Sequence, residues 1–261
     1  NAGRVTLSTT TVVASAPAIA EAAPAEGTSA KSLLDNALSG IARGDFATAV
    51  DMLTEVRKIR PNDSFVIQQL ALATYKARQP NEEIALLAAK ELLDELKPAT
   101  TNDPETLGLW GAIHKRLWIL YERQSDLDAG IDADERGFHH KQDTYNGINL
   151  AYLLDARALR ALRRGDRDEG LTDTVVAKRT RRQVIDYALP LLDKEINVEK
   201  RFWILATLRE AAEGLGDAAA AAKWQADAQA LNAPAWMLES CETQGAALRA
   251  IRAQIAQLLN A

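Results

Sequence analysis

Apolar residues recur at helical spacing from residue 31 to the end of the chain, and this regularity constrains the fold more than any other feature. Strand patterns are almost missing from the same region. Turn formers such as Gly44-Asp45, Pro61-Asn62-Asp63 and Gly216-Asp217 recur at short intervals. The pattern therefore predicts an all-α chain. We expect helices at 31–43, 46–60, 63–78, 81–97, 104–123, 127–142, 144–164, 173–195, 198–215, 217–231 and 234–259.

The turn at Gly44-Asp45-Phe46 carries the spacing of a tetratricopeptide repeat. A small residue follows at Ala49, a large one at Leu53 and a proline at Pro61. The small residue lets two helices approach, and the proline ends the second helix. Residues 216–234 repeat this spacing within one residue. The sequence therefore predicts a right-handed α-solenoid of about five helix pairs, in which stacking covers the apolar face of each pair.

Residues 1–30 differ in composition from the rest of the chain. They are rich in Ala, Thr, Ser and Pro, and the chain begins Asn1-Ala2-Gly3. This composition is typical of an interdomain linker or a tag-derived segment. We therefore expect a linker at 1–30, with another domain before it, and one helical domain at 31–261. The last helix is expected to cap the solenoid with an apolar stripe of Leu248, Ile251, Ile255, Leu258 and Leu259.

Composition narrows the classes of function. The net charge of -5 disfavours a nucleic-acid partner. One cysteine and three scattered histidines predict no disulfide, no metal site and no cofactor. The sequence contains no run of about 18 apolar residues, so we expect no membrane contact and a cytoplasmic location. It also lacks a glycine-rich phosphate loop, a His-Glu-x-x-His motif and a nucleophile elbow, which predicts a protein that is not an enzyme.

Three motifs are more specific than the general pattern. The first is the stretch 104–116, which contains Leu109-Trp110-Gly111-Ala112-Ile113-His114-Lys115-Arg116. The second is Tyr145-Asn146-Gly147-Ile148-Asn149-Leu150-Ala151, and the third is Pro234-Ala235-Trp236. Together they resemble the TRAFs-binding domain of the apoptosis signal-regulating MAP3 kinases and its bacterial relatives, which are also described as tetratricopeptide sensor domains. The resemblance covers roughly 31–255. One departure is Ala112, where the family has arginine.

The resemblance implies a regulatory module and not a catalyst. In the kinases, the similar region engages partner proteins. In bacteria, similar domains accompany effector domains of conflict and stress systems, and they are proposed to sense a nucleotide-derived or NAD-derived small molecule. Two hypotheses follow for this chain. It either binds such a small molecule on its concave face and controls a fused effector domain, or it grips a protein partner through the solenoid groove without a small ligand.

The candidate ligand-binding residues come from the first two motifs. Lys115 lies one helical turn after Gly111, and Arg116 follows it. Both cations are candidates for contacts with an anion, and the alternative is that they are solvated charges. Gly111 either makes room for a ligand or allows close packing of two helices, at a cost of about 1 kcal/mol in helix propensity.

The second motif opens a helix. Tyr145, Asn146 and Gly147 follow the expected caps Asp143 and Thr144. Free N–H groups at a helix N-terminus suit phosphate, and Gly147 either lets a ligand approach or permits tight helix packing. Asn149 shares a face with Tyr145 and either pins a neighbouring helix or binds a polar ligand.

A basic stretch begins at Arg157 and runs to Arg167. It is either a solvated face interlaced with acidic residues, or one wall of an anion-binding groove or a docking patch for an acidic partner. RNA binding is disfavoured because no stacking aromatic residues accompany it. Trp236, after Pro234, is expected to anchor the capping helix. The candidate site is Lys115, Arg116, Tyr145, Asn146, Gly147, Asn149 and Arg157.

Overall fold

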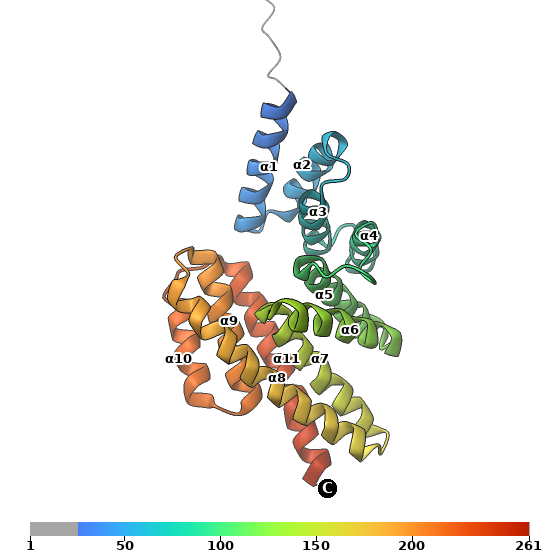
Figure 1. Ribbon diagram of the computed structural model, residues 1–261, viewed down its shortest axis with the longest axis vertical. Helices are drawn as coiled ribbons and strands as arrows, with labels where there is room; N and C mark the ends of the chain where they lie inside the picture. The colour runs from blue at the N-terminus through green and yellow to red at the C-terminus, as the bar shows by residue number, and fades with distance from the viewer. Residues whose placement is uncertain (1–25, 261) are drawn as a thin grey trace, which may run out of the picture.

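The computed structural model describes residues 26–260, with side chains from residue 29 onward, and this part of the chain is entirely helical and without strands. The predicted all-α solenoid is confirmed (Figure 1). Its helices are α1 (Glu26–Arg43), α2 (Phe46–Ile59), α3 (Ser64–Ala77), α4 (Glu82–Asp94), α5 (Pro104–Tyr121), α6 (Gln124–Lys141), α7 (Thr144–Arg163), α8 (Arg167–Lys194), α9 (Val198–Leu215), α10 (Ala218–Gln229) and α11 (Ala235–Asn260).

Side-chain caps set most of the helix boundaries. Eight helices follow an Asp or Asn whose side chain accepts a hydrogen bond from a first-turn N–H. The turn Gly44-Asp45 is used again at Gly165-Asp166 and Gly216-Asp217. In each, the glycine has a φ of +82° or +83° and ends one helix, while the aspartate caps the next. The same two-residue device therefore joins α1 to α2, α7 to α8, and α9 to α10.

Helices that are consecutive in the sequence pack as five pairs, α1–α2 to α9–α10. The odd-numbered helices α3, α5, α7 and α9 also contact one another in turn, and they form the inner row of the solenoid. We call the surface of this row the inner face. The buried apolar residues are distributed over several local clusters along the array, as expected where each pair packs mainly on its neighbours.

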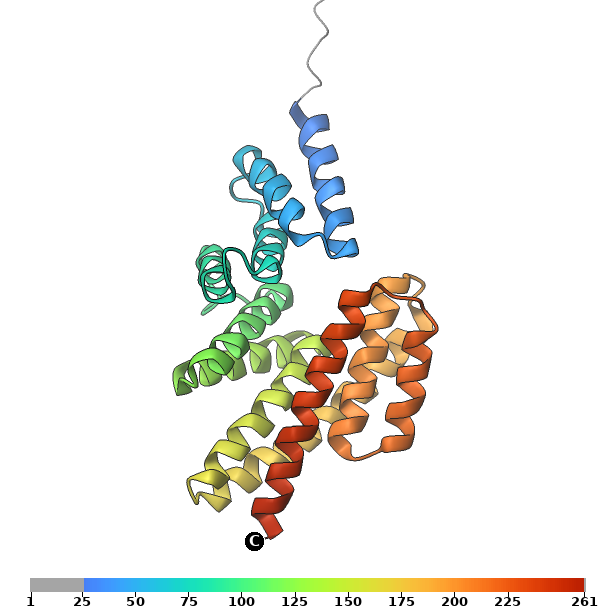
Figure 2. The ribbon, with the colours of Figure 1, turned by 180° about the vertical axis from the view of Figure 1, so that it is seen from behind.

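Helix α11 runs back along the inner row (Figure 2). It packs on α7 and α9, with Leu248 buried beside Leu154 and Ile255 buried beside Leu159 and Leu162. The predicted apolar stripe of this helix therefore covers the inner face of the C-terminal half. The inner surfaces of α3 and α5, which belong to the N-terminal half, are left largely uncovered by α11.

Three predicted boundaries need correction. Helix α1 begins at Glu26, so residues 26–30 belong to this helix and not to the expected linker; residues 1–25 lie outside the described part of the chain. Helix α6 begins at Gln124 instead of 127. Helix α8 begins at Arg167 instead of 173, because Asp166 caps its first turn by accepting a hydrogen bond from the N–H of Glu169. Among the residues described, none of the helices is both apolar enough and long enough to span a bilayer.

Candidate functional site

The structure brings two of the predicted site residues into direct contact. Lys115 on α5 is buried, and its Nζ donates a hydrogen bond of 2.6 Å to Oδ1 of Asn149 on α7. A second, longer bond of 3.3 Å goes to Oε1 of Gln244 on α11. Asn149 in turn donates to the carbonyl of Tyr145 at 2.9 Å. Through these bonds Lys115 links α5, α7 and α11 beneath the surface of the inner face.

The charge of Lys115 is not neutralised by an ion pair within the described residues. Burial and the nearby Arg116 lower the pKa of its ammonium to about 8. Burial also raises the pKa of two neighbouring carboxyls, Asp134 and Glu210. The carboxyl of Asp134 is fully buried and occupies the space that a side chain at Gly111 would fill, since a Cβ there would lie 2.5 Å from its Oδ1. Gly111 thus accommodates a buried acid.

Asn146 and Gly147 serve packing in this structure. Asn146 is buried and donates to the carbonyl of Pro104 at 3.0 Å, which ties α7 to the start of α5. A Cβ at Gly147 would lie 2.5 Å from Phe138 and 2.6 Å from Val184. The first turn of α7 is therefore filled by neighbouring helices at the point where a ligand could have approached.

Arg157 lies two turns beyond Asn149 and is not part of the same cluster. Its guanidinium makes a two-pronged ion pair with Asp173 on α8, at 2.7 and 2.8 Å. Further along the basic stretch, Arg163 bonds to Gln254 and Arg167 to the carbonyl of Leu259, both on α11. Much of this stretch therefore fastens α7 and α8 to each other and to the end of α11.

Arg116 and Tyr145 remain available on the inner face. Arg116 is half-buried, and its guanidinium lies 4.8 Å from the ring centroid of Tyr75 on α3. Its single hydrogen bond among the described residues goes to the carbonyl of Ala112 in its own helix. Tyr145 is 45% exposed and lies beside Gly108, where a Cβ would be 3.1 Å from its ring. A cation and an exposed aromatic ring thus flank the surface between α5 and α7.

Sequence reasoning missed Lys76 on α3. Its Nζ lies 5.7 Å from the ring centroid of Tyr75 and 5.3 Å from that of Trp236 on α11. Burial, Arg116, Lys115 and Arg78 lower the pKa of Lys76 to about 7. The sequence held little signal for this residue, because α3 has none of the three motifs and its neighbours other than Tyr75, such as Trp236 and Arg116, come from distant helices.

Trp236 anchors α11 as predicted, but on the opposite end of the solenoid. Its Nε1 donates to the carbonyl of Ala42 at 3.2 Å, and its ring packs edge-on against Phe46 at 5.3 Å between centroids. A Cβ at Gly44 would lie 2.7 Å from the indole. We call this contact between Trp236 and the turn of Ala42–Phe46 the seam, because it joins the first helix pair to the last helix.

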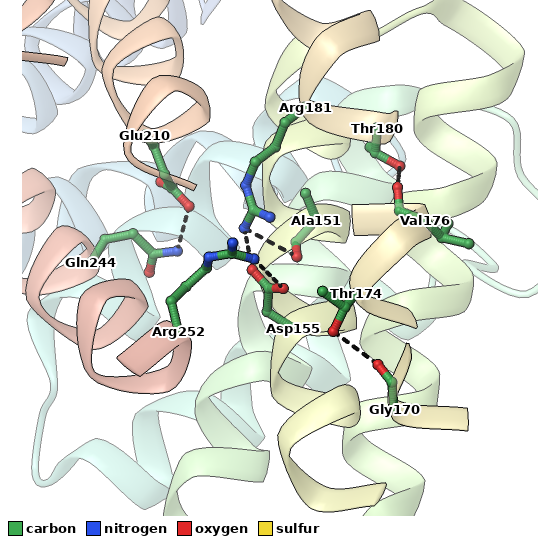
Figure 3. A network of polar contacts seen from close by, with 10 residues as sticks. All are labelled: Ala151, Asp155, Gly170, Thr174, Val176, Thr180, Arg181, Glu210, Gln244 and Arg252. Carbon is green, nitrogen blue, oxygen red and sulfur yellow. Dashed lines mark hydrogen bonds and ion pairs between the residues drawn. The ribbon is translucent and has the colours of Figure 1, made fainter. Parts of the chain in front are cut away.

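Polar side chains hold the middle of α11 against the inner row (Figure 3). Arg181 on α8 and Asp155 on α7 form an ion pair of 2.7 Å in which both side chains are fully buried. Arg252 on α11 joins Asp155 at 3.3 Å. Gln244 connects α11 to Glu210 on α9 at 3.1 Å and also accepts the longer bond from Lys115. Lys115 therefore contacts the helix that covers the inner face.

The residues described offer no group of three or more His, Cys, Asp or Glu side chains suited to a metal ion. His114 is buried, and its Nδ1 lies 2.9 Å from Oδ1 of Asp126. This contact joins α5 to α6 next to the first motif.

Comparison with known proteins agrees with this architecture. Residues 45–154 match the family model described as Tetratricopeptide Repeats-Sensor. No curated protein matches the chain. Among solved structures, a thermophilic TPR protein of Thermus thermophilus is 15% identical, with a TM-score of 0.52, and the match covers 89% of this chain and all of that one. The MamA protein is 17% identical, with a TM-score of 0.44, over 78% of this chain and 92% of that one. The chain thus has a tetratricopeptide-type solenoid fold, and its residues 45–154 are similar to sensor-type repeats.

Proposed function

We propose that this chain is a non-catalytic regulatory module that binds an anionic, nucleotide-derived or NAD-derived small molecule on its inner face. Arg116 and Tyr145 contact the ligand, and the Lys115–Asn149 pair supports the surface from behind. Asn146, Gly147 and Arg157 position the helices. The module controls an attached effector domain in a bacterial signalling or conflict system. The match to sensor-type tetratricopeptide repeats supports this proposal.

One observation carries the proposal. Arg116 presents a cation over the buried ring of Tyr75, on the same inner face as the exposed Tyr145, and has no carboxylate partner in the described part of the chain. Arg157 and Arg181, by contrast, each hold a buried aspartate. A guanidinium left without an acid, on the same face as an exposed aromatic ring, suits an anion attached to a flat base.

The position of α11 favours a small ligand over a long peptide. A peptide that followed the whole inner face would cross α7 and α9, and α11 already packs on both helices. The part of the inner face that α11 leaves free, around Arg116 and Tyr145, is shorter than the whole inner face. A compact ligand is therefore the better match to the surface that remains.

A second candidate function is a scaffold for a protein partner, and a different surface supports it. At the α8–α9 loop, Ile196 is 93% exposed and Val198 is 55% exposed. They adjoin a hollow of about 340 Å³ lined in part by Leu191, Trp203 and Ile204. Exposed apolar residues around a hollow are typical of protein interfaces. Ile196→Asp should abolish partner capture if this surface is used, and it should leave small-molecule binding unchanged.

A thermal-shift screen tests the first function. The panel contains ADP-ribose, NAD, cyclic ADP-ribose forms, cyclic dinucleotides and simple nucleotides. A ligand at about 100 times its Kd adds roughly 2.7 kcal/mol to the free energy of unfolding, which raises Tm by roughly 5–10 °C in a chain of this size. Arg116→Gln and Tyr145→Ala should remove the shift, whereas Arg60→Gln, at the C-terminal end of α2, should keep it. A panel without any shift at millimolar concentrations would overturn the proposal.

A further inference from the structure

Lys76, Lys115 and Arg116 form an unusual group of cations. Each lies within 6 Å of an aromatic ring centroid: Lys76 and Arg116 at Tyr75, and Lys115 at Tyr152. Lys76 and Arg116 lie at the same Tyr75 ring, and Lys115 directly precedes Arg116 on α5, so the three charges are neighbours. Like charges repel one another, and their proximity is unfavourable unless an anion lies among them.

The rest of the chain supplies an internal comparison. Three other cations in the described residues lie over aromatic rings, and each has a carboxylate partner. Lys90 over Trp110 pairs with Asp94 at 3.2 Å. Arg123 over Tyr121 pairs with Asp126 at 2.6 Å, and Lys223 over Trp224 pairs with Asp227 at 3.2 Å. Only the inner-face group lacks such an acid among the residues described.

Different helices supply the walls around this group. Tyr75 and Lys76 come from α3, Arg116 comes from α5, and Tyr145 comes from α7. Trp236 comes from the start of α11 and lies 5.3 Å from Nζ of Lys76. The ring of Tyr75 is buried beneath Lys76 and Arg116, whereas that of Tyr145 is exposed. The surface thus offers a place for an anion beside a free aromatic ring.

We propose that Lys76 and Arg116 together bind the phosphate part of the ligand at the Tyr75 ring, with Tyr145 stacking on its base and Trp236 forming the wall toward the seam. Lys76 Nζ and the Arg116 guanidinium lie 5.7 and 4.8 Å from the same ring centroid, so a diphosphate reaches both. The ligand class is therefore a diphosphate attached to a flat ring. The part of this inference that concerns the base rests on the proposed function. The part that concerns the phosphate rests on the three cations without an ion-pair partner.

Calorimetry and tryptophan fluorescence with two probes, inorganic pyrophosphate and ADP, test the inference at pH 6.5. We expect Lys76→Gln and Arg116→Gln each to weaken the binding of both probes tenfold or more. Tyr145→Ala should weaken the binding of ADP by a similar factor and leave the binding of pyrophosphate unchanged. Lys90→Gln is the matched control, because it removes a cation over a ring that has its own acid. Binding should also change the tryptophan fluorescence, because the ring of Trp236 lies 5.3 Å from Nζ of Lys76.

The outcomes separate this inference from the proposed function. If ADP binds and Lys76→Gln binds it as tightly as the wild type, the sensor proposal stands and the two-cation site is wrong. If pyrophosphate binds through Lys76 but ADP and the nucleotide panel do not, the two-cation site stands and the nucleotide proposal is wrong. If neither probe binds at millimolar concentration, the two-cation site is overturned, and the sensor proposal is then decided by the nucleotide panel alone. Circular dichroism of each variant shows that loss of binding is not loss of fold.

Discussion

At the scale of single residues, this protein uses charged side chains in two opposite ways. Asp155 and Arg181 are fully buried and hold each other at 2.7 Å. A Cβ at Gly214 would lie 2.0 Å from Nε of Arg181, so the glycine makes the space for the guanidinium. Lys76 and Arg116, in contrast, are half-buried and lack an acidic partner among the residues described. The first pair joins α7 to α8, and the second pair is the one that we propose binds a ligand.

Removal of Asp155 should be strongly destabilising. Asp155→Ala leaves the guanidinium of Arg181 buried without its partner and takes the acid away from Arg252 as well. We expect the free energy of unfolding to fall by about 3–5 kcal/mol in urea denaturation. Asp227→Ala, which breaks the exposed pair with Lys223, should cost less than about 1 kcal/mol. Equal effects in the two variants would show that the buried pair has no special role.

The affinity for pyrophosphate should depend on pH through Lys76. Its pKa is lowered to about 7 by burial and by Arg116, Lys115 and Arg78, while Cys241 acts in the other direction. An anion binds the protonated amine, so loss of this proton should weaken binding as the pH rises through about 7, in opposition to the growing charge of pyrophosphate itself. Loss of the Lys115 proton near pH 8 should extend the fall. In Lys76→Arg the charge persists, and the ionisation of pyrophosphate is common to both proteins. Calorimetry should therefore find that the affinity of the wild type relative to Lys76→Arg falls as the pH rises; a ratio that rises with pH would contradict the mechanism.

At the scale of helices, the sequence predicted the elements better than their contacts. Local signals were sufficient for the Gly-Asp turns and for most boundaries, because caps and left-handed glycines act within a few residues. They were sufficient for the apolar stripe of α11 as well. They could not reveal that Gln244 and Arg252 on α11 meet Lys115 and Asp155, since these pairs are about a hundred residues apart. Arg116 was a predicted site residue, but its position at the ring of Tyr75 on α3 was missed for the same reason, and so was Lys76.

The Gly-Asp turns should be sensitive to substitution for a purely backbone reason. Gly216 has a φ of +83°, and a Cβ there would meet no atom within 4 Å. Gly216→Ala should therefore lower the free energy of unfolding by about 1–2 kcal/mol through left-handed strain alone. Gly216→Asn should cost less, because asparagine tolerates this conformation. Chemical denaturation of the two variants measures the difference; an alanine variant as stable as the wild type would show that the turn relaxes.

At the scale of the whole molecule, the solenoid curves until its two ends meet at the seam. The first helix pair has its own apolar cluster with α3, and Trp236 belongs to the cluster of α9 and α11. The indole thus crosses between two otherwise local cores through Ala42 and Phe46. The repeat pattern predicted the stacking of pairs, but the meeting of the ends depends on accumulated curvature, which no local pattern reports.

Trp236 contacts both Lys76 and the turn Ala42–Phe46 of the seam, so occupation of the anion site should tighten the seam. Trp236→Ala removes the hydrogen bond to Ala42 and the ring packing on Phe46, so we expect faster hydrogen exchange in α1 and α2 and unchanged exchange in α7 and α8.

In the wild type, pyrophosphate should slow hydrogen exchange in α1–α3, since an anion between Lys76 and Arg116 offsets the repulsion between these cations on α3 and α5. Trp118→Phe, on α5 and packed against a different apolar cluster, is the control. If pyrophosphate binds and leaves exchange in α1–α3 unchanged, the seam is a fixed joint, and a signal from the inner face would have to leave through Gln244 and α11 instead.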